Sequence, residues 1–229
     1  MNDSFAQRFA IVNERIAEAA SKAERQRSDI TLISVSKTFT ADIVSDAVNS
    51  GATDLGENRV QDAHAKKPQI PPTCWHLIGP LQRNKVRPAL ETFDVIHTLD
   101  RPELAERLQR MLDERWPNRR LRVLIQVNVG QEDQKAGAAL EDVGHLLRIA
   151  RNCDHLCVEG LMAIPPYARD PEATRPYFRM LRELRDQLQD SIGDSLPHLS
   201  MGMSSDFETA IEEGATMVRV GTALFGSRS

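Results

Sequence analysis

Lys37 is the lysine whose position best suits covalent chemistry. The chain has six lysines, and this one alone ends an apolar stretch, residues 31–37, with the composition of a β-strand. Strand alternation places Lys37 on the same face as Ile33 and Val35. If that face points inward, burial favours the neutral amine, a nucleophile that forms Schiff bases. A solvated lysine at a strand end explains the same position.

A second stretch whose residues could bind a ligand covers residues 217–226. Val218 and Val220 alternate there with Arg219 and Gly221, so one face of the stretch is apolar and the other is not. With the valines directed outward, Arg219 is a fixed inward cation, and Gly221 lets the backbone approach an anion closely. A structural ion pair is the alternative for Arg219.

Two serines precede a predicted helix over residues 207–213. Ser204 and Ser205 lie where hydroxyls and the first N–H groups of that helix would converge on a phosphate. Ser205 with Glu208 fits a capping box, so Ser204 is the better phosphate candidate. The usual glycine-rich signals for nucleoside triphosphates and dinucleotides do not occur in the sequence.

Several other polar residues carry weaker signals. Gln126 and Asn128 share one face of their segment, which suits either a polar site or an ordinary internal hydrogen-bond network. Residues 153–157 hold two cysteines and a histidine, but their spacing matches no strong zinc pattern, and we predict no metal site. The remaining candidates are Glu57, Asn58, Arg59, His76 and, in a polar loop, Lys135.

A repeating fold must position these residues, because short β-rich segments recur along the whole chain. Segments with helical spacing separate most of them, and strands that alternate with helices require a parallel sheet. A further helix over residues 5–20, capped by Asn2 or Asp3, precedes the first strand. The predicted strands cover residues 31–37, 54–58, 74–79, 95–100, 121–130, 158–165, 198–204 and 217–226.

Eight such units in 229 residues favour an α/β fold closed into a (β/α)8 TIM-type barrel. The extra N-terminal helix would pack on its outside, and residues 1–229 would form one domain. An open, doubly wound sheet is the alternative. In a barrel, functional side chains belong at the carboxyl ends of the strands, which is where Lys37 and Arg219 fall.

Composition limits the classes of function. Charged residues make up 27% of the chain and the net charge is −4, which disfavours a nucleic-acid partner. Apolar runs are short and the N-terminus lacks a basic region, so we predict neither a membrane segment nor a signal peptide. Three cysteines, an odd number, fit reduced thiols, and we expect a cytoplasmic protein.

A Schiff-base lysine, a phosphate site and an inward arginine together specify a pocket for pyridoxal 5′-phosphate. The sequence also resembles the pyridoxal phosphate homeostasis protein family, also called the YggS/PROSC family, over nearly the whole chain. Several motifs in the same order and spacing carry this resemblance. They are Ser-Val-Ser-Lys at 34–37, Gly-Glu-Asn-Arg-Val-Gln at 56–61, Trp-His-Leu-Ile-Gly-Pro-Leu-Gln-Arg-Asn-Lys at 75–85, Gly-Leu-Met-Ala-Ile-Pro at 160–165, and residues 199–206 and 218–226.

The resemblance implies a fold like the barrel domain of bacterial alanine racemase. It also implies that Lys37 forms an aldimine with the cofactor and that Arg219 faces the pyridine nitrogen. This chain has Gly130 where the family often has a serine, and it retains Lys135. The other residues implied to bind the cofactor are Asn58 near the ring and Ser204, Gly221 and Thr222 at the phosphate.

An arginine beside the pyridine nitrogen leaves that nitrogen unprotonated and a poor electron sink, which disfavours transaminase and decarboxylase chemistry. A racemase needs a second acid or base, which alanine racemases take from a second domain that this chain is too short to contain. We therefore expect a monomer that holds the cofactor and delivers it to recipient apo-enzymes, without substantial catalysis. An amino-acid racemase and a Schiff-base aldolase acting through Lys37 are the alternatives.

Overall fold

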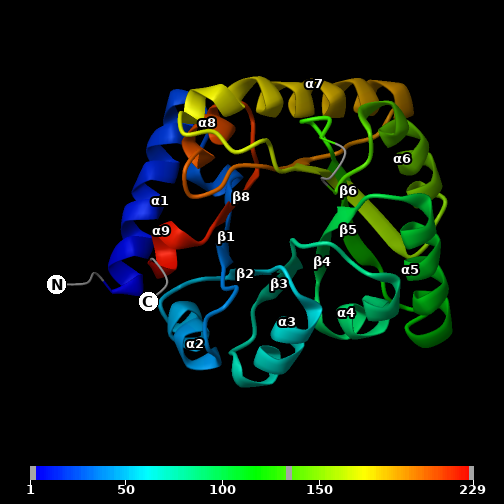
Figure 1. Cartoon of the computed structure of the whole chain (residues 1–229), viewed down its shortest axis with the longest axis horizontal. Coiled ribbons are helices and arrows are strands. Elements are labelled where there is room, and N and C mark those ends of the chain that lie inside the picture. Colours follow the sequence, from blue (N-terminus) through cyan, green and yellow to red (C-terminus); the bar gives the residue numbers. More distant parts are fainter. Residues whose placement is uncertain (1–3, 133–135, 227–229) are drawn as a thin grey trace.

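A closed barrel of eight parallel strands forms the centre of the protein. The structure, a computed structural model, describes residues 4–132 and 136–226. The strands follow one another around the barrel in chain order, and β1 pairs with both β2 and β8. Helices surround the strands on the outside (Figure 1). The barrel predicted from the alternation of strands and helices is confirmed, and the open sheet is wrong.

All eight strands end earlier than predicted, because composition does not show where the hydrogen bonds between strands stop. The sixth strand also begins at Leu156 rather than Val158, and the last segment turns into a short helix instead of continuing as a strand. The bounds are β1 (Thr31–Val35), β2 (Asp54–Glu57), β3 (Cys74–Leu77), β4 (Val95–Leu99), β5 (Leu121–Val127), β6 (Leu156–Ala163), β7 (His198–Ser200) and β8 (Met217–Val220).

The helices follow the predicted spacing more closely. Pro102 opens its helix at a position where the missing N–H costs nothing. Gly51 and Gly214 follow helices with φ of +108° and +99°, a conformation that favours glycine. The α-helices of the described residues are α1 (Phe5–Lys22), α2 (Ala41–Asn49), α3 (Val60–Lys66), α4 (Val86–Thr92), α5 (Pro102–Arg115), α6 (Val143–Arg151), α7 (Arg175–Ile192), α8 (Phe207–Glu212) and α9 (Thr222–Phe225).

The helix α1 lies on the outside of the barrel, against α8 and α9 (Figure 1). A capping box begins it: Ser4 Oγ accepts a hydrogen bond from the backbone of Gln7, and the Gln7 side chain accepts one from the backbone of Ser4. The caps predicted from the sequence, Asn2 and Asp3, lie outside the described residues.

Two apolar layers hold the barrel together. The larger one lies between the strands and the surrounding helices, and it includes Val218 and Val220. A smaller cluster fills the barrel interior around Ile33. The inward face of β1 and the outward valines of β8 are therefore as expected. The other members of the inner cluster are Val95, Leu124, Met162 and Met217.

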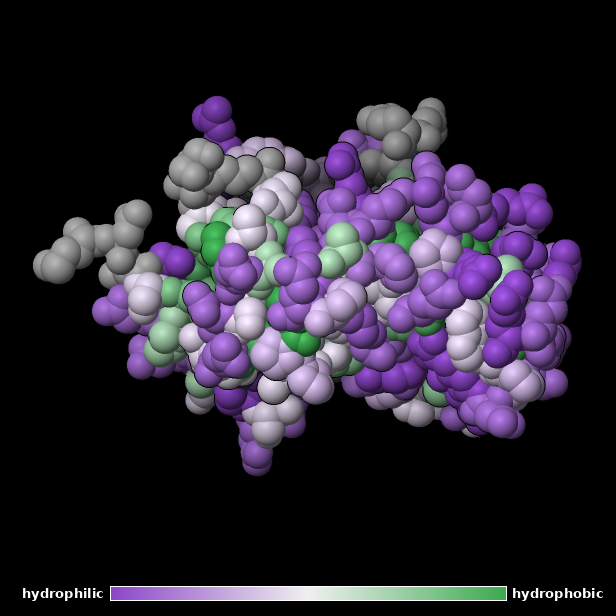
Figure 2. Space-filling model, turned by 90° about the horizontal axis from the view of Figure 1, so that it is seen from below, coloured by the Kyte–Doolittle hydropathy of each residue, from purple (hydrophilic) through white to green (hydrophobic). Residues whose placement is uncertain are grey.

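The outer surface is mainly hydrophilic. In the view of Figure 2, hydrophobic residues form small separate areas among charged and polar ones. No helix in the part of the chain that the structure describes is long and apolar enough to cross a membrane. The large hydrophobic residues that stay exposed are Ile11, Ile43, Ile164 and Tyr167.

Candidate functional site

A cavity of about 650 Å³ opens at the carboxyl ends of the strands, within the range typical of small-molecule sites. The segments after β1, β2, β3, β6, β7 and β8 build its walls. Its apolar lining includes Phe39, Ile78 and Tyr167, which the sequence alone did not single out. All six residues predicted to bind a cofactor line it: Lys37, Asn58, Ser204, Arg219, Gly221 and Thr222.

Lys37 lies just beyond the end of β1, not within the strand. The strand ends at Val35, and Lys37 is exposed. The burial that was expected to favour its neutral amine is therefore absent, because the chain has already left the barrel. Thr38 follows in a left-handed conformation, φ +73°, which costs a non-glycine residue about 1–3 kcal/mol. This turn holds Lys37 at the edge of the cavity.

Arg219 is buried at the base of the cavity, with only 4% of its surface exposed. Its Nη1 donates to Ser200 Oγ at 2.6 Å, and its Nη2 donates to the carbonyl oxygen of Ala163 at 2.8 Å. Burial lowers the pKa of Arg219 to about 10, against the opposing charge of Asp206, so the side chain stays charged at neutral pH. The structural ion pair considered as an alternative is not formed by direct contact with any described carboxylate.

Ser204 joins the loops after β7 and β8. Its Oγ accepts hydrogen bonds from the backbone N–H of Gly221 at 3.2 Å and of Ala223 at 3.4 Å. Gly221 has φ −115°, and a Cβ added there would meet Val35 at an ordinary 3.5 Å. Neither conformation nor close packing requires glycine at this position.

The predicted capping box of Ser205 with Glu208 is wrong. The cap of α8 is Asp206, whose Oδ1 accepts a hydrogen bond from the backbone of Met203 at 2.7 Å. Ser205 is exposed at the cavity, and Glu208 pairs with Arg15 of α1 instead. The motif fits by spacing alone, but the helix begins one residue later than the motif requires.

Asn58 lines the cavity directly after β2 and is half-buried. The chain after β3 passes so close to it that a Cβ on Gly79 would lie 2.2 Å from the backbone oxygen of Asn58. Glycine at position 79 is therefore a packing requirement of this wall of the cavity.

Two of the weaker candidates, Gln126 and Asn128, have structural roles. Gln126 is buried and donates to the carbonyl oxygen of Ala136, and Asn128 donates to that of Glu132, so both belong to an internal network. In the cysteine-rich stretch, His155 Nδ1 lies 2.8 Å from the backbone oxygen of Arg119. Lys135 lies outside the described residues.

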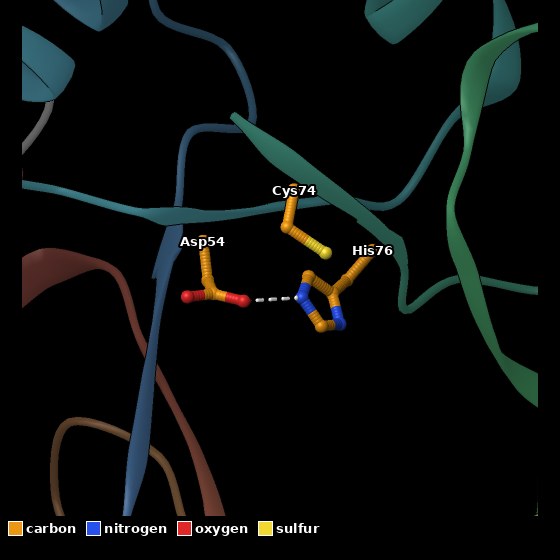
Figure 3. Close-up of side chains that lie close together, drawn as sticks. All are labelled: Asp54, Cys74 and His76. Carbon is orange, nitrogen blue, oxygen red and sulfur yellow. Dashed lines mark hydrogen bonds and ion pairs between the residues drawn. The ribbon is translucent and has the colours of Figure 1, made fainter. Parts of the chain in front are cut away.

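A second polar group lies at the opposite end of the barrel, where the strands begin. Asp54, Cys74 and His76 point toward one another there, with their possible ligand atoms within 4.8 Å (Figure 3). Burial, aided by the carboxylates of Asp54 and Asp94, raises the pKa of Cys74 to about 12. No local spacing pattern in the sequence indicates this group, because Asp54 lies on β2 whereas Cys74 and His76 lie on β3.

Comparison with known proteins places the chain among close relatives. Residues 12–229 match the family model for the N-terminal domain of alanine racemase. The pyridoxal phosphate homeostasis protein of Aquifex aeolicus is 45% identical over 225 residues, with 97% of each chain covered.

Solved structures agree with this placement. PipY of Synechococcus elongatus, solved with pyridoxal phosphate (PLP) bound, is 38% identical; the match covers 92% of this chain and 100% of that chain, with a TM-score of 0.81. Alanine racemase of Corynebacterium glutamicum is only 16% identical, covers 97% of this chain and 62% of its own, and has a TM-score of 0.75. That last likeness shows the fold alone.

Proposed function

The chain belongs to the pyridoxal phosphate homeostasis protein family, and on that premise we propose that it binds pyridoxal 5′-phosphate at the barrel mouth. Its role is homeostasis of that cofactor, without substantial catalysis of its own. One observation carries the proposal: Lys37, Ser204 and Arg219, from distant parts of the chain, line one cavity of suitable size. The PipY relative, 38% identical, has the cofactor bound in its structure.

Each cavity residue has a distinct part in this proposal. The cofactor supplies an aldehyde that a lysine amine can bind covalently, and Lys37 is the lysine on this cavity. Arg219 stands as a buried cation at the base, suited to face the ring nitrogen, and Asn58 lines the wall beside it. The phosphate would be held by Ser204, Gly221 and Thr222.

The chemistry of the cavity supports a carrier better than an enzyme. Arg219 keeps its proton at neutral pH, so a ring nitrogen facing it stays unprotonated and withdraws electrons poorly. The racemase alternative needs a fixed acid or base on the other side of the substrate. Tyr167 lines the cavity but is 86% exposed, which leaves it without the packing that would fix its position.

We also propose that the cofactor is handed on to recipient apo-enzymes. Lys37 is exposed, so an acceptor can reach a cofactor attached to it. We also propose that the protein is a monomer with a single domain over residues 1–229, since one closed barrel accounts for the described residues. The three cysteines form no disulfide, which supports a cytoplasmic location.

The visible absorption spectrum of the protein with added pyridoxal phosphate tests this proposal. We expect a band from lysine-bound cofactor in the parent and in Lys22→Ala, a control that removes an exposed lysine of α1, and no band in Lys37→Ala. Borohydride reduction followed by peptide mass analysis would locate the attachment. A missing band in the parent would overturn the cavity assignment and favour the aldolase, and robust racemisation of an amino acid would contradict a carrier.

A further inference from the structure

Five polar side chains form a hydrogen-bonded row, or file, across the barrel interior: Asp54, His76, His97, Ser200 and Arg219. His76 Nε2 lies 2.9 Å from Asp54 Oδ1, and His76 Nδ1 lies 2.9 Å from His97 Nε2. On the other side of His97, its Nδ1 lies 2.9 Å from Ser200 Oγ. Ser200 Oγ in turn accepts the 2.6 Å hydrogen bond from Arg219. Four consecutive hydrogen bonds thus connect the two ends of the barrel.

These residues lie on five different strands. Asp54 begins β2 at the end away from the cavity, whereas Arg219 lines the cavity. The step from His97 on β4 to Ser200 on β7 joins strands that are not neighbours in the barrel. The hydrogen bonds therefore pass through the interior, where His76, His97 and Ser200 are each at most 1% exposed.

The guanidinium sets the direction of every hydrogen in this file. Arginine only donates, so Ser200 Oγ accepts from Arg219, and His97 Nδ1 is the other described partner for the hydroxyl hydrogen. Burial holds the pKa of His97 well below its usual value, so the ring is neutral. With Nδ1 accepting, its single hydrogen is on Nε2 and is donated to His76 Nδ1.

The same reasoning places the hydrogen of His76. Because its Nδ1 accepts from His97, the hydrogen is on Nε2 and is donated to Asp54. Burial has the largest single effect on Asp54 and raises its pKa, but the interactions with His76, Thr53 and Cys74 together outweigh burial. The pKa is therefore lower than usual, and the group is a carboxylate. All donors point from the cation toward this carboxylate, and aligned hydrogen bonds polarise one another.

This order also explains the cluster in Figure 3. His76 Nε2 is the atom that a metal ion would need, and it carries the hydrogen that bonds Asp54. Asp54 and His76 are therefore the end of the hydrogen-bonded file, and together with the neighbouring Cys74 they are not a set of free metal ligands.

We propose that Asp54, His76, His97 and Ser200 are positioning residues that act through Arg219. They hold the guanidinium with its charge toward the cavity. Through the hydrogen bonds, a change in the charge of Asp54 alters the interaction of Arg219 with any ligand that it contacts. The order of hydrogens stands by itself, and only the effect on the ligand rests on the proposed function.

Nitrogen NMR of the histidine rings in cofactor-free protein tests the order of hydrogens. We expect His76 and His97 to be neutral with the hydrogen on Nε2, and Asp54→Asn to shift the ring nitrogens of both. Asp194→Asn is the matched control, because it makes the same change at an exposed aspartate that pairs with Arg151 and contacts no residue of the file. The order would be overturned if the hydrogen of His76 were found on Nδ1. It would also be overturned if addition of zinc shifted the NMR signal of His76 Nε2.

Titration with pyridoxal phosphate tests the effect on the ligand. We expect Asp54→Asn to weaken binding about fivefold and to move the absorption band, while Asp194→Asn changes neither. If both variants bind like the parent although the NMR order is found, transmission through Arg219 is wrong. If the parent shows no band, the ligand part is overturned together with the proposed function, and the NMR result still decides the order.

Discussion

The backbone N–H of Gly221 donates to the hydroxyl oxygen of Ser204 at 3.2 Å, across 17 residues of the chain. The N–H of Ala223 is directed at the same oxygen at 3.4 Å. With its oxygen receiving two donors, Ser204 keeps its own hydrogen available to an acceptor in the cavity. A phosphate oxygen is such an acceptor, and a hydrogen bond to a charged group is stronger than one between neutral groups.

Ser204→Ala should therefore weaken binding of pyridoxal phosphate by about tenfold, the effect of losing one hydrogen bond of about 1.5 kcal/mol to a charged group. Binding of pyridoxal, which lacks the phosphate, should stay unchanged. Ser28→Ala, which removes an exposed hydroxyl outside the cavity, is the control. Titrations with both ligands measure the difference, and an equal loss for the two would place Ser204 elsewhere than at the phosphate.

Gly160→Ala should strongly destabilise the barrel. A Cβ at this position would lie 1.8 Å from the carbonyl oxygen of His198 on the neighbouring strand, so β6 and β7 would have to separate. We expect a loss of about 3 kcal/mol or more in the free energy of unfolding, measured by urea denaturation.

Gly144→Ala is the matched control for that substitution. The nearest atom to its added Cβ is in Leu188 at 3.7 Å, and the residue lies inside α6. Gly144 is the second residue of α6, and alanine favours the helical conformation over glycine, so this variant should gain up to about 1 kcal/mol. Equal effects of the two substitutions would contradict the close approach of β6 and β7.

Thr38→Gly should stabilise the protein and weaken its site. Glycine removes the strain of the left-handed conformation, which stabilises the folded state by about 1–3 kcal/mol. Glycine also raises the conformational entropy of the unfolded state, which destabilises the folded state by about 0.5–1 kcal/mol. We expect a net gain of about 1 kcal/mol in thermal or urea unfolding. The looser turn should also lower the affinity for pyridoxal phosphate, and a stability loss would show that Thr38 is not strained.

Protein stability should decrease as the pH falls below about 6.5, the usual pKa of an unfolded histidine. Burial places the pKa of folded His97 well below that value, so the unfolded state binds the proton first. The contribution of His97 to the free energy of unfolding is therefore complete above pH 6.5. Below pH 6.5 the free energy of unfolding falls by about 1.4 kcal/mol per pH unit, until the pKa of folded His97 is reached. Urea denaturation at several pH values measures this slope.

His97→Gln should flatten that dependence, although His198, whose pKa burial also lowers, leaves part of it. An unchanged slope in His97→Gln would show that His97 does not remain neutral in the folded protein.

The sequence by itself determined the order of elements and the end of the barrel at which the candidates lie. Alternating strand and helix patterns require parallel strands, and closing eight of them brings their carboxyl ends together. Residues that follow different strands, such as Lys37, Asn58 and Ser204, then meet because of their place in the chain. Local periodicity was sufficient for this, since burying one face of each element leaves few arrangements.

Only the tertiary structure decided the exact strand ends, the exposure of Lys37 and the hydrogen-bonded file that ends at Arg219. A strand ends where its neighbours stop accepting hydrogen bonds, and composition does not record this. His97 and Ser200 are 103 residues apart and lie on strands that are not paired, so their contact appears only when the barrel closes. Long-range hydrogen bonds of this kind depend on the geometry of the interior, which no local pattern in the chain encodes.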